Sequence, residues 1–340
     1  RGSRRRIAGR RARFSAGGCY GPWMRTAGIL AAHVLSTAAL HGPARADTAR
    51  AWAAAKAGLP ADTKVVIGID IATVQKTQLF ATFYPKLHDQ PDIAKVLDAM
   101  KDGCKIDPLA VIQGLVVASS GEQDDGAMYL AISGIDRNKL SSCLQTTAQA
   151  NAPAAEAGDK PKVTIKQTGN ITELSRGGDS GYFGWVGTNV LIVAFHATDK
   201  ASLTRWMGGK GALAKSDVGK ALARVNTSAA MWGAGTGTKE LQPGMTAKGG
   251  YGAIAYAKGQ LSVDIHAVME SAAQAGSASM MANQQLNLIK ATGQLPAEIA
   301  PVIQAITVSA DNDEVRIKGS VAEKDVLGAV AFAINNFGSP

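Results

Sequence analysis

The chain has 340 residues, with 36 basic and 27 acidic side chains and a formal net charge of +9. The basic excess lies within the first 46 residues, which hold nine arginines and no acid, so the 27 basic residues that follow balance the 27 acidic ones. We therefore do not expect a nucleic acid partner, because the charge that would bind phosphates belongs to a segment that we expect to be removed.

Residues 24–46 have the order of a bacterial signal peptide. A basic start, an apolar stretch over residues 27–40 and the small-residue site Ala44-Arg45-Ala46 follow one another. This order predicts cleavage between Ala46 and Asp47. A membrane-spanning helix fits less well, because the apolar stretch falls short of about 20 residues.

Residues 1–23 contain the basic runs Arg4-Arg5-Arg6 and Arg10-Arg11. We interpret this segment either as sequence upstream of the true start or as the extended basic region of a twin-arginine leader. No cysteine stands at the cleavage site to accept a lipid. We expect a periplasmic or secreted protein whose mature form has no transmembrane anchor.

The first elements expected after the leader are a helix and a buried strand. Residues 48–56 are rich in alanine, and Val65–Ile71 is a continuous apolar run of strand length. Helices are predicted next over residues 73–87 and 92–100, because the apolar residues recur there at helical spacing.

A unit of two strands, joined by a polar turn and followed by a helix, then recurs along the chain. Alternating apolar residues around each turn predict four such units. Their strand pairs are residues 111–119 and 127–132, 182–186 and 190–195, 251–257 and 261–268, and 305–309 and 314–321. Repeated β-β-α units predict an α+β fold in which helices pack on one face of an antiparallel sheet.

Each pair of units follows a lone strand, Lys64–Ala72 in one case and Ser228–Thr236 in the other. We therefore predict two related α+β halves, over residues 47–225 and 226–340. The segment 233–250 is rich in glycine and threonine, which predicts a loop.

Two cysteines, Cys104 and Cys143, remain after the leader. An exported chain meets an oxidising compartment, so we expect them to form a disulfide, with two separately buried thiols as the alternative. The remaining histidines stand far apart and no CxxC motif occurs, so no metal site is predicted. The glycine-rich segments lack the spacing of a nucleotide-binding loop, so no cofactor is predicted.

One short segment, Gly178-Asp179-Ser180-Gly181, resembles the nucleophile segment of chymotrypsin-like serine proteases. The segments around His33 and Asp70 resemble the histidine and aspartate segments of that family, in the family's order. This resemblance implies Ser180 as nucleophile, His33 as base and Asp70 as its orienting acid. However, His33 lies inside the predicted signal peptide and would be lost on export. We favour a plain turn at residues 177–181 and predict no catalytic residue.

Leu59-Pro60-Ala61-Asp62-Thr63 leads into the strand Val65–Ile71, and Gln78-Leu79-Phe80 and Cys104-Lys105-Ile106-Asp107-Pro108 follow. Together these segments resemble exported bacterial proteins of unknown function. The resemblance covers the first third of the chain after the leader, and it implies no activity.

The absence of any residue constellation suited to chemistry favours a non-catalytic exported protein. We expect it to bind either another envelope protein or an apolar small molecule on its sheet. Two alternatives remain: a serine hydrolase that uses Ser180, and a structural component of the envelope.

Overall fold

The computed structural model describes residues 47–120, 128–150, 163–176, 179–195, 200–291, 293 and 295–337. The predicted leader, its cleavage site after Ala46, and His33 therefore lie outside the described residues. Asp47, the predicted new N-terminus, is the first residue of the first described helix, α2.

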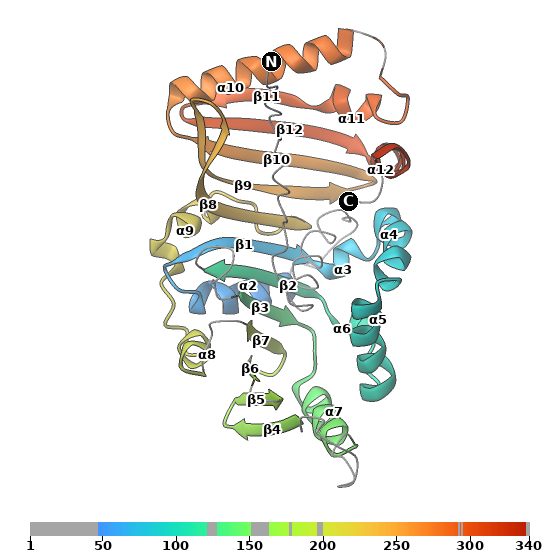
Figure 1. The fold of residues 1–340 in the computed structure, drawn as a ribbon, viewed down its shortest axis with the longest axis vertical. Coiled ribbons are helices and arrows are strands. Elements are labelled where there is room, and N and C mark those ends of the chain that lie inside the picture. The colour runs from blue at the N-terminus through green and yellow to red at the C-terminus, as the bar shows by residue number, and fades with distance from the viewer. Residues whose placement is uncertain are drawn as a thin grey trace, which may run out of the picture.

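The core of the protein is a twelve-stranded sheet in which every neighbouring pair of strands is antiparallel. Figure 1 shows the strands stacked along the long axis, with β11 near one end and β4 near the other. The predicted α+β class is confirmed. In spatial order the strands are β11 (Thr307–Asp311), β12 (Glu314–Ala322), β10 (Gln260–Met269), β9 (Met245–Ala257), β8 (Met231–Gln242), β1 (Thr63–Asp70), β2 (Gly114–Ser120), β3 (Met128–Ser133), β7 (Val190–Phe195), β6 (Asp179–Val186), β5 (Ile171–Arg176) and β4 (Val163–Thr168).

Helices cover the sheet from both sides, so the prediction of helices on a single face is not confirmed. On one face, α2, α8 and α9 pack against Val66, Ile192 and Trp232. On the other face, α7 packs near Leu191 and α10 packs near Val315. The helices are α2 (Asp47–Gly58), α3 (Ile71–Val74), α4 (Gln78–His88), α5 (Pro91–Asp98), the π-helix η1 (Ala99–Gly103), α6 (Pro108–Val111), α7 (Arg137–Ala150), α8 (Lys200–Met207), the 3-10 helix η2 (Leu213–Lys215), α9 (Asp217–Leu222), α10 (Ala272–Ala291), α11 (Ala300–Ala305) and α12 (Glu323–Phe337).

The apolar strand predicted over Val65–Ile71 is β1, which lies in the middle of the sheet. Successive side chains of a strand point to opposite faces, so a strand covered on both sides is apolar throughout. Val66 and Ile69 lie on opposite faces and are both fully buried. Between them, Gly68 leaves room for the indole of Trp232, because a Cβ atom there would stand 2.1 Å from that ring.

The loop predicted over residues 233–250 is wrong. These residues belong to the two longest strands, β8 and β9, which form a hairpin. Glycine is a weak strand former, but here it permits close packing of the backbones. A Cβ atom at Gly233 would lie 2.9 Å from the carbonyl oxygen of Val66, and Gly249 has a φ of +155°, which L side chains rarely adopt.

The predicted disulfide between Cys104 and Cys143 is present. It joins the residue after the π-helix η1 to α7, with the two Cα atoms 4.9 Å apart. Among the described residues, no helix combines the length and the apolar character needed to cross a membrane.

Candidate functional site

The residues of the serine protease hypothesis are not brought together. Ser180 is exposed on β6, and its Oγ lies 2.9 Å from Ser175 Oγ and 3.4 Å from a Glu173 oxygen. Asp70 ends β1, and strands β2, β3 and β7 separate β1 from β6 in the sheet. At about 4.8 Å per strand, β1 and β6 are on the order of 19 Å apart across the sheet. Asp70 is moreover aligned with Val186, so Ser180 is displaced farther along β6.

Asp70 has a structural role that accounts for its burial. Its carboxylate accepts a hydrogen bond of 3.0 Å from the backbone N–H of Thr73 and so caps α3. Burial raises the pKa of Asp70, and this effect exceeds the opposing effect of the cap hydrogen bond. The helix predicted over residues 73–87 is divided into α3 and α4, which residues 75–77 separate.

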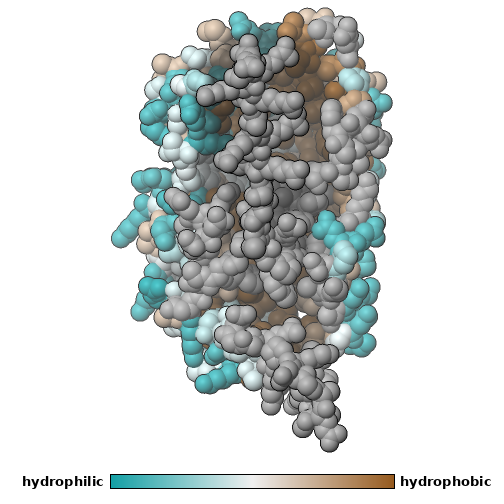
Figure 2. Space-filling model, viewed as in Figure 1, coloured by the Kyte–Doolittle hydropathy of each residue, from teal (hydrophilic) through white to brown (hydrophobic). Residues whose placement is uncertain are grey.

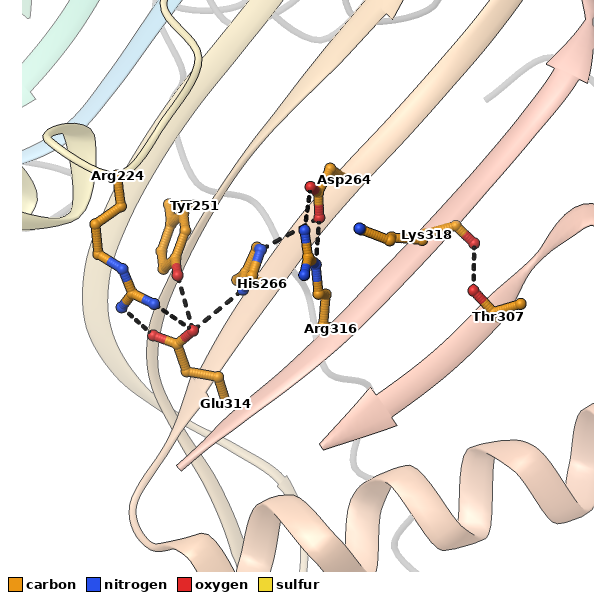
Figure 3. A network of polar contacts seen from close by, with 8 residues as sticks. All are labelled: Arg224, Tyr251, Asp264, His266, Thr307, Glu314, Arg316 and Lys318. Atoms are coloured by element: carbon orange, nitrogen blue, oxygen red, sulfur yellow. Dashed lines mark hydrogen bonds and ion pairs between the residues drawn. The ribbon is translucent and has the colours of Figure 1, made fainter. Parts of the chain in front are cut away.

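A network of polar side chains occupies one face of the sheet where β9, β10 and β12 lie side by side (Figure 3). Residues directly opposite one another in neighbouring strands share a face. Tyr251, His266 and Arg316 form one such row, and Asp264 and Lys318 belong to the next row. Arg224, just after α9, reaches the same network.

Glu314 lies at the centre of the network and is only 6% exposed. Both terminal nitrogens of Arg224 donate to its carboxylate, one of them at 2.8 Å. Tyr251 donates its hydroxyl at 2.7 Å, and His266 Nδ1 lies 3.1 Å away. Burial by itself would raise the pKa of Glu314, but the hydrogen bonds from Arg224, Tyr251 and His266 together hold that pKa below its usual value.

A second carboxylate, Asp264, is held in a similar way. Arg316 donates to its two oxygens at 2.8 and 2.7 Å, and His266 Nε2 lies 3.2 Å from one of them. The hydrogen bond from Arg316 is the main reason why the pKa of Asp264 is lowered. The imidazole of His266 therefore stands between two carboxylates, each of which also binds an arginine.

Ring contacts fix the network further. Tyr251 and His266 stack with their ring centroids 4.5 Å apart and their planes 9° apart, and the Arg224 guanidinium lies 4.7 Å from the Tyr251 centroid. Burial, and then the hydrogen bond to Glu314, raise the pKa of Tyr251, so its hydroxyl stays protonated and continues to donate.

A pocket of about 560 Å³ opens beside this network on the same face. Its floor consists of small residues of β9 and β12, including Ala253, Ala255 and Gly319. Arg224, Asp264 and His266 line one part of the pocket. The rest of its lining includes the polar residues Asn226, Ser262, Thr307, Lys318 and Ser320.

This lining can hold a polar ligand by hydrogen bonds and by charge. Among the described residues, no three His, Cys, Asp or Glu side chains form a group that could hold a metal ion. Exposed apolar side chains occur elsewhere, on α10, where Met280 is 65% and Leu288 67% exposed. Figure 2 shows hydrophobic residues at that end of the molecule.

This site was not predicted from the sequence. The signal was present as polar residues at every second position of predicted strands, in Asp264-Ile265-His266 and in Glu314-Val315-Arg316-Ile317-Lys318. Alternation of this kind places all the polar side chains of a strand on one face. The contact between Arg224 and Glu314, which are 90 residues apart, could not be predicted from spacing.

The chain matches no protein-family model and no curated protein. Among solved structures it is similar to crystal forms III, I and IV of TP0453, at 7%, 8% and 10% sequence identity and TM-scores of 0.47, 0.41 and 0.43. The matches cover 81%, 82% and 82% of this chain and 96%, 96% and 99% of those chains. At these TM-scores we infer neither fold nor function from the similarity.

Proposed function

We propose that this is an exported, non-catalytic protein that binds a polar component of the cell envelope in the pocket beside Glu314. The observation that carries the proposal is the arrangement of Arg224, Tyr251 and His266 around one buried carboxylate. Such a network holds the pocket wall in one conformation, and a site that is already ordered loses less entropy when it binds.

The pocket favours a polar partner over the apolar small molecule considered from the sequence. Sites for apolar ligands are mostly enclosed and lined by apolar side chains. This pocket is open, and hydroxyl, amide, carboxylate, guanidinium and ammonium groups line it together with small apolar residues such as Ala253, Ala255 and Ala305. We therefore retain an envelope partner and set the apolar ligand aside for this pocket.

Export is supported by the signal-like order of residues 24–46 and by the disulfide between Cys104 and Cys143. The intact mass of the protein from the extracytoplasmic fraction, before and after reduction and alkylation, tests both. We expect a chain that begins at Asp47 and gains two alkyl groups only after reduction. A chain that retains His33 would rule out the cleavage.

The proposal also includes two related halves that meet between β1 and β8. Outward from this boundary, the order β1-β2-β3-β7-β6 on one side parallels β8-β9-β10-β12-β11 on the other. In each half a helix follows the third strand, α7 after β3 and α10 after β10. The binding pocket belongs to the half that contains residues 226–340, apart from Arg224 and Val225 at its rim.

A photo-reactive amino acid placed at Ser262, in the pocket, tests the binding function in living cells. We expect one adduct of discrete mass that disappears when Glu314→Gln is added, because this change breaks the network. The same probe at Lys166, exposed on the distant strand β4, is the matched control. Adducts from both positions, or from neither, would count against the pocket as the binding site.

A further inference from the structure

We propose that the pocket binds a sugar acid, a hydroxyl-rich ring with a single carboxylate that pairs with the ammonium group of Lys318. This inference rests on the proposed function, since it names the chemistry of the ligand in the same pocket.

The two arginines of the network are already paired with carboxylates. Arg224 binds Glu314 and Arg316 binds Asp264, each through two nitrogens. Lys318 is exposed, lines the pocket and forms no ion pair among the described residues, although its charge contributes to the lowered pKa of Asp264. Because the two arginines already balance Glu314 and Asp264, Lys318 leaves one excess positive charge. That charge matches a monoanion such as a carboxylate, whereas a phosphate monoester carries about −1.5 to −2 and would stay partly unneutralised.

The rim of the pocket carries groups that can bind hydroxyls. Ser262 and Ser320 are cross-strand neighbours whose oxygens lie 3.1 Å apart, so each retains capacity for a further hydrogen bond. Asp264 has a lowered pKa and therefore stays ionised, and its side chain is 43% exposed. An ionised carboxylate only accepts hydrogen bonds. A ligand next to it must donate, as a sugar hydroxyl does.

Strand register places Asp264, which needs a hydrogen-bond donor, beside Lys318, which needs an anion. Asp264 and Lys318 are directly paired residues of β10 and β12, on the same face. A ligand that spans both must offer hydroxyl donors at one edge and an anion at the other. An acidic peptide supplies the anion but few hydroxyl donors, so the sugar acid fits the pair better.

The floor suits a ring that lies flat. Ala253 and Ala255 of β9 share the face of Asp264 and Ser262, and they place only methyl groups beneath the rim. The pocket volume of about 560 Å³ lies within the range of about 300–1,000 Å³ found for small-molecule sites. The C–H face of a pyranose ring can rest on the alanine methyl groups while its hydroxyls reach the rim.

Calorimetric titration of the mature protein with sodium galacturonate and with galactose tests the inference. The two sugars differ at one carbon, which carries a carboxylate in the first and a hydroxymethyl group in the second. We expect galacturonate to bind at least about 10-fold more tightly, because hydrogen bonds to charged groups are stronger than those between neutral groups. Lys318→Met should abolish this preference, and Lys166→Met on β4 should leave it unchanged.

Three outcomes would overturn the inference. They are equal affinity for the two sugars, an undiminished preference in Lys318→Met, and no binding of galacturonate in saturation-transfer NMR. Tighter binding of a short Asp/Glu peptide would instead assign the pocket to an acidic protein. If the Ser262 adduct still forms and a protease degrades it, the binding function stands and only the sugar acid is wrong.

Discussion

One face of this sheet is apolar and covered by helices in one half, and polar and open in the other half. On β7, Ile192 and Ala194 point into a core covered by α2 and α8, and they are 0% and 3% exposed. On β12, the strand at the same distance from the β1–β8 boundary, the residues on this face include Arg316 and Lys318. Among the described residues, no helix corresponding to α8 covers these two side chains.

The difference shows that a helix packed over a sheet face determines which side chains that face can carry. Under α8, an unpaired polar group would lose its hydration without compensation, which costs several kcal/mol. On the open side, water remains available, and the two carboxylates there each receive an arginine from a neighbouring strand or loop. The same kind of sheet therefore forms a core in one half and an open polar surface in the other.

Truncation of a buried side chain of α8, the helix that covers the apolar half, should have the largest effect on stability. Trp206 of α8 is 3% exposed, donates its indole N–H to Ala54 at 3.3 Å and packs edge-on against Tyr129. We expect Trp206→Ala to lower the free energy of unfolding by about 3–5 kcal/mol, because it leaves a cavity between α2, α8 and the sheet. Urea denaturation followed by circular dichroism measures the loss. Leu288→Ala, at a site 67% exposed on α10, is the control and should stay within about 0.5 kcal/mol.

Removal of the disulfide should cause the second largest loss in the free energy of unfolding. Cys104 and Cys143 are 39 residues apart, and both belong to the half with the covered face. Replacement of both by alanine should lower the free energy of unfolding by about 2–4 kcal/mol, chiefly because the unfolded chain regains the freedom of an open loop. If the reduced wild-type protein and the doubly substituted variant have different denaturation midpoints, loss of packing around Cys143 contributes to the effect as well.

On the open face, Glu314→Gln should cost about 1.5–3 kcal/mol, because Arg224 and His266 lose a charged acceptor. The pKa of Glu314 is lower in the folded state than its ordinary value of 4.5. Its contribution is therefore fully present above about pH 4.5 and is lost as the pH falls through the folded-state pKa. The difference in the free energy of unfolding between the wild type and Glu314→Gln should therefore shrink in acid. A difference that stays constant down to pH 2 would show that lost packing, not lost charge, causes the effect.

Local elements of this fold could be predicted from the sequence, whereas their assembly could not. Turns such as Gly187-Thr188-Asn189 and Asp311-Asn312-Asp313 separate apolar runs and indicate hairpins, and both hairpins are present as β6–β7 and β11–β12. By contrast, the pairing of β1 with β8 brings Ile67 opposite Gly233. Packing across a distant pair of strands determines that contact, and no local pattern encodes it.

The glycine-rich part of β8 and β9 was mispredicted for a related reason. Glycine indicates a loop when only neighbours in sequence are considered, yet Gly233 and Gly252 are needed because backbone carbonyls approach them to 2.9 and 2.6 Å from where a Cβ would stand. The candidate site was missed because its charges are dispersed over three strands and Arg224. Each residue alone is an ordinary polar residue of an exposed strand face.

We expect the smallest effect on stability from Lys318→Met. This variant separates ligand binding from folding on the open face. Lys318 is exposed, and its ammonium group enters none of the ion pairs recorded for the described chain, so Lys318→Met should change the free energy of unfolding by less than about 0.5 kcal/mol. Glu314→Gln should weaken both stability and ligand binding, whereas Lys318→Met should weaken ligand binding alone. A loss of stability above 1 kcal/mol in Lys318→Met, measured by the same urea titration, would mean that this lysine belongs to the structural network and is not held ready for a ligand.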